Sequence, residues 1–259
     1  MSIRINIDPT NPGQFFACCG LLEMADRLWP GAEGWFEERA FCIDAQGLAE
    51  LMRAIANAEL RQCDAEDDTG SPIEIRAPFR PLVLEWWQDG LAGGKELKVW
   101  AGTMESFRIA RAMQNAMRTE RFHSPDLFDV GMIAYDPDDA EKKVEPYYFD
   151  ARRGPNAHSR DVGFSPNDLG LTSMAHPAVE LLCLVGLQRC RPARTPLQRV
   201  FDYFTWAKPL PPELLPAAVT GELGWPDSQG YRFENWYRTG QRKHKAFRSA
   251  IPIQKESDR

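Results

Sequence analysis

Residues 2–31 read SIRINIDPTNPGQFFACCGLLEMADRLWPG, a strand pattern that runs directly into a capped helix. Residues 2–8 alternate apolar and polar side chains, which indicates a strand with one buried face. Asn11 then stands at the expected N-cap and Pro12 at the first helical position, a combination typical of a helix start. Pro30 and Gly31 are expected to end the helix. Its buried stripe consists of Phe15, Phe16, Cys19, Leu22 and Leu28.

Two short apolar segments and a second helix continue this N-terminal pattern. Trp35-Phe36 and residues 41–43 predict two short strands, and residues 48–60 predict the second helix. The resulting β-α-β-β-α order is that of part of a ferredoxin-like unit. We therefore expect an α+β fold: an N-terminal ferredoxin-like unit with a mixed or antiparallel sheet, followed by a helix-richer half.

The rest of the chain divides into a central region and a C-terminal region. The predicted domains are an N-terminal α+β unit at 1–62, a central α+β region at 63–207, and a C-terminal connector with a basic aromatic tail at 208–259. The nearly all-apolar stretch 178–187 predicts a helix buried on every side. Further strands are predicted at 73–76, 82–87, 97–100 and 197–206, and a helix capped by Thr103 at 104–121.

Charge is unevenly distributed along the chain. The net charge is −6, which disfavours a free-standing nucleic-acid binder. Residues 33–68 hold ten acidic and three basic side chains, whereas residues 95–123 hold six basic and three acidic ones. The tail 229–259 holds eight basic and three acidic side chains. Such segregation suits a subunit that contacts a polyanion with one face and protein with another.

The clearest basic constellation lies on the predicted helix 104–121. At 100° per residue its arginines and one amide fall within an arc of roughly 80°, and about 15 Å separates the first arginine from the last. These residues are Arg108, Arg111, Asn115 and Arg118. Such a face fits several phosphates, or alternatively a solvated surface paired to carboxylates.

A second constellation follows three aromatic residues. Residues 147–170 have no helical period and contain several glycines and prolines, so they predict a loop. Arg152, Arg153 and Arg160 would be held beside Tyr147, Tyr148 and Phe149, as on a surface that stacks bases and binds phosphates. The alternative is a Tyr-Tyr-Phe strand that enters the core, with the arginines bridging to the acidic segment before it.

The third constellation is the tail, in which residues 231–238 alternate aromatic and charged side chains before a basic run. It is typical of a docking arm for nucleic acid or protein, or of a partly disordered charged terminus. The candidate nucleic-acid-binding residues are Lys98, Arg108, Arg111, Asn115, Arg118, Arg152, Arg153, Arg160, Arg242, Lys243 and Lys245.

Catalytic and metal-binding patterns are weak. The sequence contains no Gly-x-Ser-x-Gly, no complete phosphate-binding loop and no His-Glu-x-x-His. The six cysteines lack Cys-x-x-Cys spacing, and Cys18 and Cys19 fit small core residues. We therefore predict no enzyme activity, no cofactor and no metal. Two alternatives remain open: a metal-dependent hydrolase using Asp136, Asp138, Asp139 and His123, and a protein-only adaptor.

Several ordered blocks resemble one known family. In order, they are Asn11-Pro12-Gly13-Gln14 with Cys19-Gly20-Leu21-Leu22-Glu23, then Lys98-Val99-Trp100-Ala101-Gly102, Phe149-Asp150-Ala151-Arg152-Arg153, Asp161-Val162-Gly163-Phe164-Ser165-Pro166, and Val179-Glu180-Leu181-Leu182 with Gly186-Leu187. This series resembles CRISPR-associated subunits of the type I-G systems, formerly called I-U, and in particular their large-subunit-like component. The blocks extend over about residues 11–190, and their order carries the resemblance.

The resemblance implies a non-catalytic role in antiviral defence. Such subunits belong to an RNA-guided surveillance complex of the Cascade kind, contact the CRISPR RNA, the target DNA and the backbone subunits, and recognise the motif that flanks the target. The nuclease is a separately recruited helicase–nuclease. The present chain is short for this role and shows no C-terminal helical bundle, since residues 208–230 are rich in proline and glycine. With no signal peptide or membrane-spanning run expected, a cytoplasmic location follows from the sequence.

Overall fold

The N-terminal unit has the predicted order of elements. A computed structural model describes residues 2–67, 70–101, 104–156, 174–238 and 242–254, so Thr103 and Arg160 lie outside the described residues. The unit consists of β1 (Ser2–Asn6), α1 (Pro12–Leu28), β2 (Glu33–Glu37), β3 (Ala40–Asp44) and α2 (Leu48–Asn57). Its sheet is antiparallel in the order β1-β3-β2, so β1 and β2 flank the strand that follows them both. This is the strand order of a split β-α-β unit.

The strand after α2 leaves this sheet. β4 (Leu60–Gln62) pairs with β5 (Ile73–Ile75), which pairs with β6 (Leu82–Leu84), in a separate antiparallel sheet. The N-terminal sheet is extended instead by the connector far along the chain, because Gly34 and Leu210 exchange backbone hydrogen bonds. The indole N–H of Trp206 also donates to the Gly34 carbonyl at 2.8 Å.

Three central elements differ from their sequence predictions. The strand expected at 82–87 ends at Leu84, because Trp86–Gln88 form a short 3-10 helix. The expected strand 97–100 is wrong, because the short helix α3 (Gly94–Leu97) occupies its start. Gly93 takes a left-handed φ of 81°, and a Cβ on Gly94 would lie 1.7 Å from the Trp86 carbonyl oxygen. This close approach was not visible in the apolar pattern. The helix expected at 104–121 is α4 (Ser106–Ala116), so Arg118 follows the helix rather than continuing its face.

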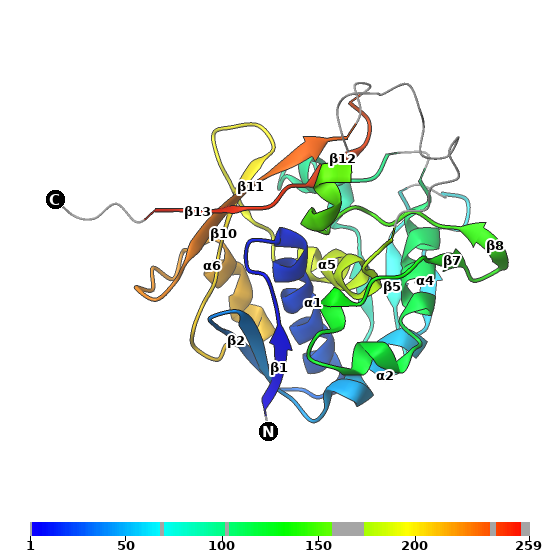
Figure 1. Cartoon of the computed structure of the whole chain (residues 1–259), viewed down its shortest axis with the longest axis horizontal. Helices are drawn as coiled ribbons and strands as arrows, with labels where there is room; N and C mark the ends of the chain where they lie inside the picture. Colours follow the sequence, from blue (N-terminus) through cyan, green and yellow to red (C-terminus); the bar gives the residue numbers. More distant parts are fainter. Residues whose placement is uncertain (1, 68–69, 102–103, 157–173, 239–241, 255–259) are drawn as a thin grey trace.

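The centre of the molecule is a pair of closely packed helices (Figure 1). α5 (Pro177–Arg189) is buried around its circumference, which confirms the prediction from its apolar run. It meets α1 at Gly20 and Gly186, where an added Cβ would lie 2.0 Å from a carbonyl oxygen of the opposite helix. Glycine at both positions therefore permits backbone-to-backbone contact.

Five C-terminal strands form one sheet, so the segments that contain them are not a free arm. β9 (Ala193–Arg194), β10 (Val200–Phe204), β11 (Gly230–Tyr237) and β12 (Lys245–Phe247) pair in that order, and β13 (Ile251–Pro252) pairs with β11. Tyr231, Phe233 and Asn235 are buried, so the predicted docking arm and the predicted disordered terminus are both wrong for residues 230–237. The alternating pattern of this segment is that of a half-buried strand. α6 (Leu215–Val219) lies between β10 and β11, and β7 (Tyr135–Asp136) pairs with β8 (Asp139–Lys143).

These elements share one hydrophobic core. The core joins α1 and α5 to residues of all three predicted regions, among them Phe36, Trp100 and Phe247. The α+β class with antiparallel sheets is confirmed. Beyond the N-terminal unit, where a helix-richer half is expected, α3 to α6 are interspersed with β4 to β13 in the described residues. Within the described residues, no helix combines the length and the apolar character needed to cross a membrane.

Candidate nucleic-acid interface

The arginines of α4 are already paired with carboxylates. Arg111 donates two hydrogen bonds to Asp138, at 2.6 and 3.0 Å, and Arg108 donates to Asp136. Glu105 lies 3.8 Å from Arg108. The pair with Asp138 raises the pKa of Arg111, and the same bond lowers the pKa of Asp138. The structure therefore agrees with the alternative stated for this helix, an arginine face that is paired to carboxylates. The exposed Arg118 takes part in neither pair.

The β7–β8 hairpin supplies these carboxylates and lines a small pocket with α4. The pocket contains Arg108, Arg111, Asp136 and Asp138 side by side. The described residues include no group of three or more histidine, cysteine or acidic side chains placed to hold a metal ion. For the hydrolase alternative, the described residues therefore offer no set of metal ligands. Two of its proposed aspartates, Asp136 and Asp138, bind arginines.

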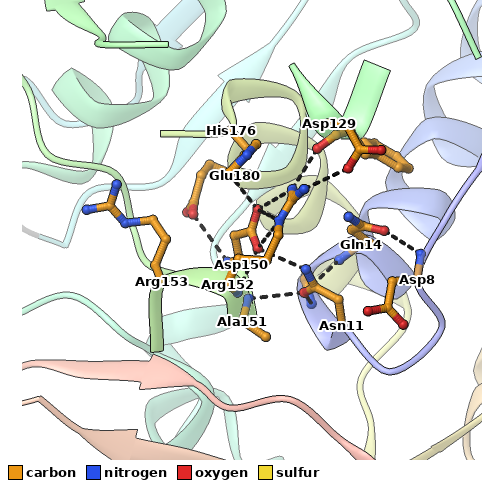
Figure 2. Close-up of polar contacts among 12 residues, drawn as sticks. Asp8, Asn11, Gln14, Asp129, Asp150, Ala151, Arg152, Arg153, His176 and Glu180 are labelled. Atoms are coloured by element: carbon orange, nitrogen blue, oxygen red, sulfur yellow. Dashed lines mark hydrogen bonds and ion pairs between the residues drawn. The ribbon is translucent and has the colours of Figure 1, made fainter. Parts of the chain in front are cut away.

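Arg152 belongs to a buried polar network rather than to a free loop (Figure 2). Its guanidinium donates to both oxygens of Asp150, at 2.6 to 3.1 Å, and to Asp129 at 2.7 Å. Asp150 also accepts from the Asn11 side chain at 2.8 Å and lies 2.9 Å from His176 Nδ1. Burial opposes ionisation of Asp150, but the bonds from His176 and Arg152 outweigh it and hold its pKa well below the usual range.

A second buried carboxylate holds the backbone of the same segment. Glu180, on α5, accepts backbone N–H bonds from Tyr148, Phe149 and Asp150 at 3.0 to 3.2 Å. It is fully buried, and burial together with the nearby charge of Asp150 raises its pKa to about 7. Tyr148 takes a left-handed φ of 79°, which these bonds stabilise.

The aromatic residues before Arg152 are part of the core. Tyr147 and Phe149 are fully buried and Tyr148 is 9% exposed, so the predicted exposed stacking surface is wrong. Arg153 is also buried: it donates to the Met174 carbonyl and lies 3.4 Å from Glu145. Figure 2 shows its side chain pointing away from the network that contains Arg152. Its guanidinium lies 4.6 Å from the centre of the Tyr148 ring.

Basic side chains interact with one another near the end of β11 and the start of β12. We define the hairpin cation cluster as Lys98, Arg153, Arg199, Arg238, Lys243, His244 and Lys245. Arg238 lies 3.4 Å from the centre of the Tyr148 ring that Arg153 also contacts. The structure thus brings together predicted candidates from three distant segments, namely Lys98, Arg153 and the pair Lys243 and Lys245.

The members of the hairpin cation cluster repel one another. Burial lowers the pKa of Lys245 to about 8, with Arg199 and Lys98 contributing and Glu96 opposing. Burial also lowers the pKa of Arg238, to which Arg153 contributes, while Tyr148, Glu145 and Glu180 oppose. The pKa of His244 is lowered by burial, Arg238 and Lys243. An anion bound here would relieve this repulsion.

Three members of the cluster, Arg199, Arg238 and His244, are not among the predicted nucleic-acid-binding residues. Arg199 takes a left-handed φ of 60° just before β10, and Arg238 follows β11. No local pattern marks Arg199, because only the pairing of β10 with β11 brings it to the hairpin. Arg242 and Lys243 are exposed at the turn, and Asn115 is half-buried on α4.

Comparisons of the chain with protein-family models, with curated proteins and with solved structures found no match.

Proposed function

We propose that this protein is a non-catalytic subunit of a type I-G CRISPR surveillance complex and contacts guide RNA or target DNA through the hairpin cation cluster. Its partners in this proposal are the CRISPR RNA, the target DNA, the backbone subunits and other effector subunits. The helicase–nuclease would be recruited separately, and recognition of the motif that flanks the target is included in the proposed role.

The observation that carries the proposal is the convergence of the blocks on which the family resemblance rests. Asn11 of the first block bonds to Asp150 of a later block, and Glu180 of the last block holds residues 148–150. Gly20 and Gly186 meet where α1 crosses α5. Three of the blocks that carry the resemblance therefore form one buried centre, as expected if the chain shares the fold of that family. The block at 161–166 lies outside the described residues.

The charge distribution also supports a nucleic-acid-binding subunit over an independent binder. The whole chain is acidic, while the C-terminal hairpin concentrates basic side chains. A subunit within a complex needs only such a local basic face, because pairing with the guide supplies sequence specificity. The aromatic strand β11 is buried in the sheet, which disfavours the protein-only adaptor that would use it as a docking arm.

Reconstitution tests the proposed function. The chain is co-expressed with the other type I-G effector subunits and a guide RNA, and the complex is purified through a tag on a backbone subunit. We expect this chain to co-purify stoichiometrically and to be required for tight binding of target DNA. A complex that binds its target with full affinity in the absence of this chain would overturn the proposal.

Two single substitutions of exposed residues, one test variant and one control, examine the role of the hairpin. Lys243→Glu, on the exposed turn of the hairpin, is expected to weaken target binding while the chain still co-purifies. Arg53→Ala removes one positive charge from an exposed position on α2, an element that Figure 1 shows away from β11 and β12, and is expected to change neither.

A further inference from the structure

Three members of the hairpin cation cluster converge from separate parts of the chain. Lys98 follows α3, Arg199 precedes β10 and Lys245 begins β12. The backbone N–H of Lys245 donates to the Val99 carbonyl at 2.9 Å, which places β12 beside Lys98. The N–H of Asn235 donates to the Arg199 carbonyl at 2.9 Å, so β11 connects Arg199 to the same hairpin.

None of these three cations forms an ion pair with a described residue within 4.0 Å. Lys245 Nζ donates only to the carbonyls of Lys95 and Glu96, at 3.3 and 3.1 Å. Lys98 Nζ lies 5.0 Å from the centre of the Trp100 ring, and Arg199 lies 4.6 Å from that of Tyr237. The nearest carboxylate on α3, that of Glu96, is bound by Arg194 at 3.1 Å.

The arrangement is held at an energetic cost. Arg199 adopts a left-handed backbone that branched and long side chains rarely take, and its buried Nε has no hydrogen-bond partner in the described structure. Burial disfavours the charged form of Lys245, and the charges of Arg199 and Lys98 add to this effect, which lowers its pKa. Backbone strain beside cations that form no ion pair with a described residue is typical of a ligand site.

We propose that Lys98, Arg199 and Lys245 form a binding site for one phosphate group of a nucleic-acid strand. The proposal rests on the proposed function, which supplies the strand. A guanidinium and two ammonium groups suit a phosphate, because the fork of Arg199 binds two oxygens while the lysines act as point charges. The phosphate comes either from within the strand or from a 5′ end.

The experiment measures binding of fluorescein-labelled single-stranded RNA 12-mers, with and without a 5′ phosphate, by anisotropy at 50 and 200 mM salt. The variants are Arg199→Asn, which suits the left-handed backbone, and Lys245→Met, which keeps the apolar stem. We expect each to weaken binding at 50 mM salt about tenfold and to reduce the dependence of affinity on salt. Arg53→Ala is the control and is expected to stay within about twofold of the parent.

The two RNA arms distinguish the sources of the phosphate. Loss that is confined to the 5′-phosphorylated RNA assigns the site to a terminal phosphate, and equal loss on both RNAs assigns it to an internal one. Parent-like affinity and salt dependence in both folded variants would overturn the proposal. If a variant unfolds, the site is tested in the parent protein by acylation of Lys245 with and without the 5′-phosphorylated RNA. We expect the RNA to protect Lys245, and absence of protection would contradict the site.

These outcomes separate the site from the proposed function. Should both variants bind RNA like the parent while the chain still co-purifies with the complex, only the phosphate site fails. Should the variants lose RNA binding while the parent chain neither joins the complex nor affects target binding, the phosphate site stands and the CRISPR proposal fails.

Discussion

The side chain of Asn11 bonds to Asp150, 139 positions along the chain, while it caps helix α1. Its amide nitrogen donates to Asp150 Oδ1 at 2.8 Å. Its oxygen accepts from the backbone N–H groups of Gly13 and Ala151, at 3.1 Å each. One buried amide therefore sets the start of α1 and the position of the segment that carries Arg152.

We predict that Asn11→Ala destabilises the protein by about 2–4 kcal/mol, since it removes a helix cap and leaves buried polar partners unsatisfied. Asn11→Asp keeps an oxygen for the cap but sets a second carboxylate against Asp150. We expect Asn11→Asp to be at least as destabilising at pH 7 and to recover as the pH falls. Urea unfolding at pH 7 and pH 4 measures this, and equal deficits of the Asp variant at both pH values would contradict it.

The contact between α1 and α5 yields a second prediction. Gly20→Ala would place a Cβ 2.0 Å from the Leu182 carbonyl oxygen, so the helices must separate. We expect a loss of about 3 kcal/mol or more, in the upper range of overpacking effects. Gly90→Ala is the matched control, because its Cβ would meet only the Lys95 side chain at 3.7 Å or beyond. Thermal unfolding compares the two, and equal melting temperatures would refute the close crossing.

Local patterns predicted the elements that are specified locally. The cap at Asn11, the buried helix at Pro177–Arg189 and the N-terminal strand-helix-strand unit follow from residue type and period. Short stretches of sequence did not reveal contacts between residues that lie far apart along the chain. The carboxylates of Asp136 and Asp138 lie more than 25 positions from the arginines they bind, and the tail reads as a charged arm until β10 pairs with it.

Glu180 should make stability depend on pH. Its pKa of about 7 in the folded protein lies above the usual 4.5, so the folded state binds more protons than the unfolded state between these values. The stabilising contribution of the neutral form is therefore present below pH 4.5 and lost as the pH rises through 7. Glu180→Gln removes this titration while an oxygen still accepts from Tyr148 and Phe149.

We expect the parent protein to lose more stability between pH 5 and pH 8 than Glu180→Gln does, in urea unfolding. The comparison cancels titrations that both proteins share, including that of Asp150, whose pKa lies far lower. Parallel profiles for the two proteins would show that Glu180 keeps its ordinary pKa.

The pairs on α4 predict a gain of binding. Asp136 and Asp138 neutralise Arg108 and Arg111, and like phosphates they present oxygens to the guanidinium groups. Asp136→Asn with Asp138→Asn frees Arg111 and leaves Arg108 with the Glu105 carboxylate at 3.8 Å, so we expect single-stranded RNA to bind severalfold more tightly, with a steeper salt dependence. Arg108→Ala with Arg111→Ala should lower affinity less than Arg199→Asn does. A reversed order of these two effects would place the main interface on α4.

Lys245 should be unusually nucleophilic. With a pKa of about 8 its amine is half neutral at pH 8, whereas an ordinary lysine is neutral in fewer than about 1 molecule in 100. We expect a limiting amount of an acylating reagent at pH 8 to modify Lys245 several times faster than the exposed Lys243, as measured by peptide mass spectrometry. Because Arg199 contributes to the lowered pKa, Arg199→Asn should slow the modification of Lys245 and leave Lys243 unchanged. Equal rates at the two lysines in the parent protein would contradict the lowered pKa of Lys245.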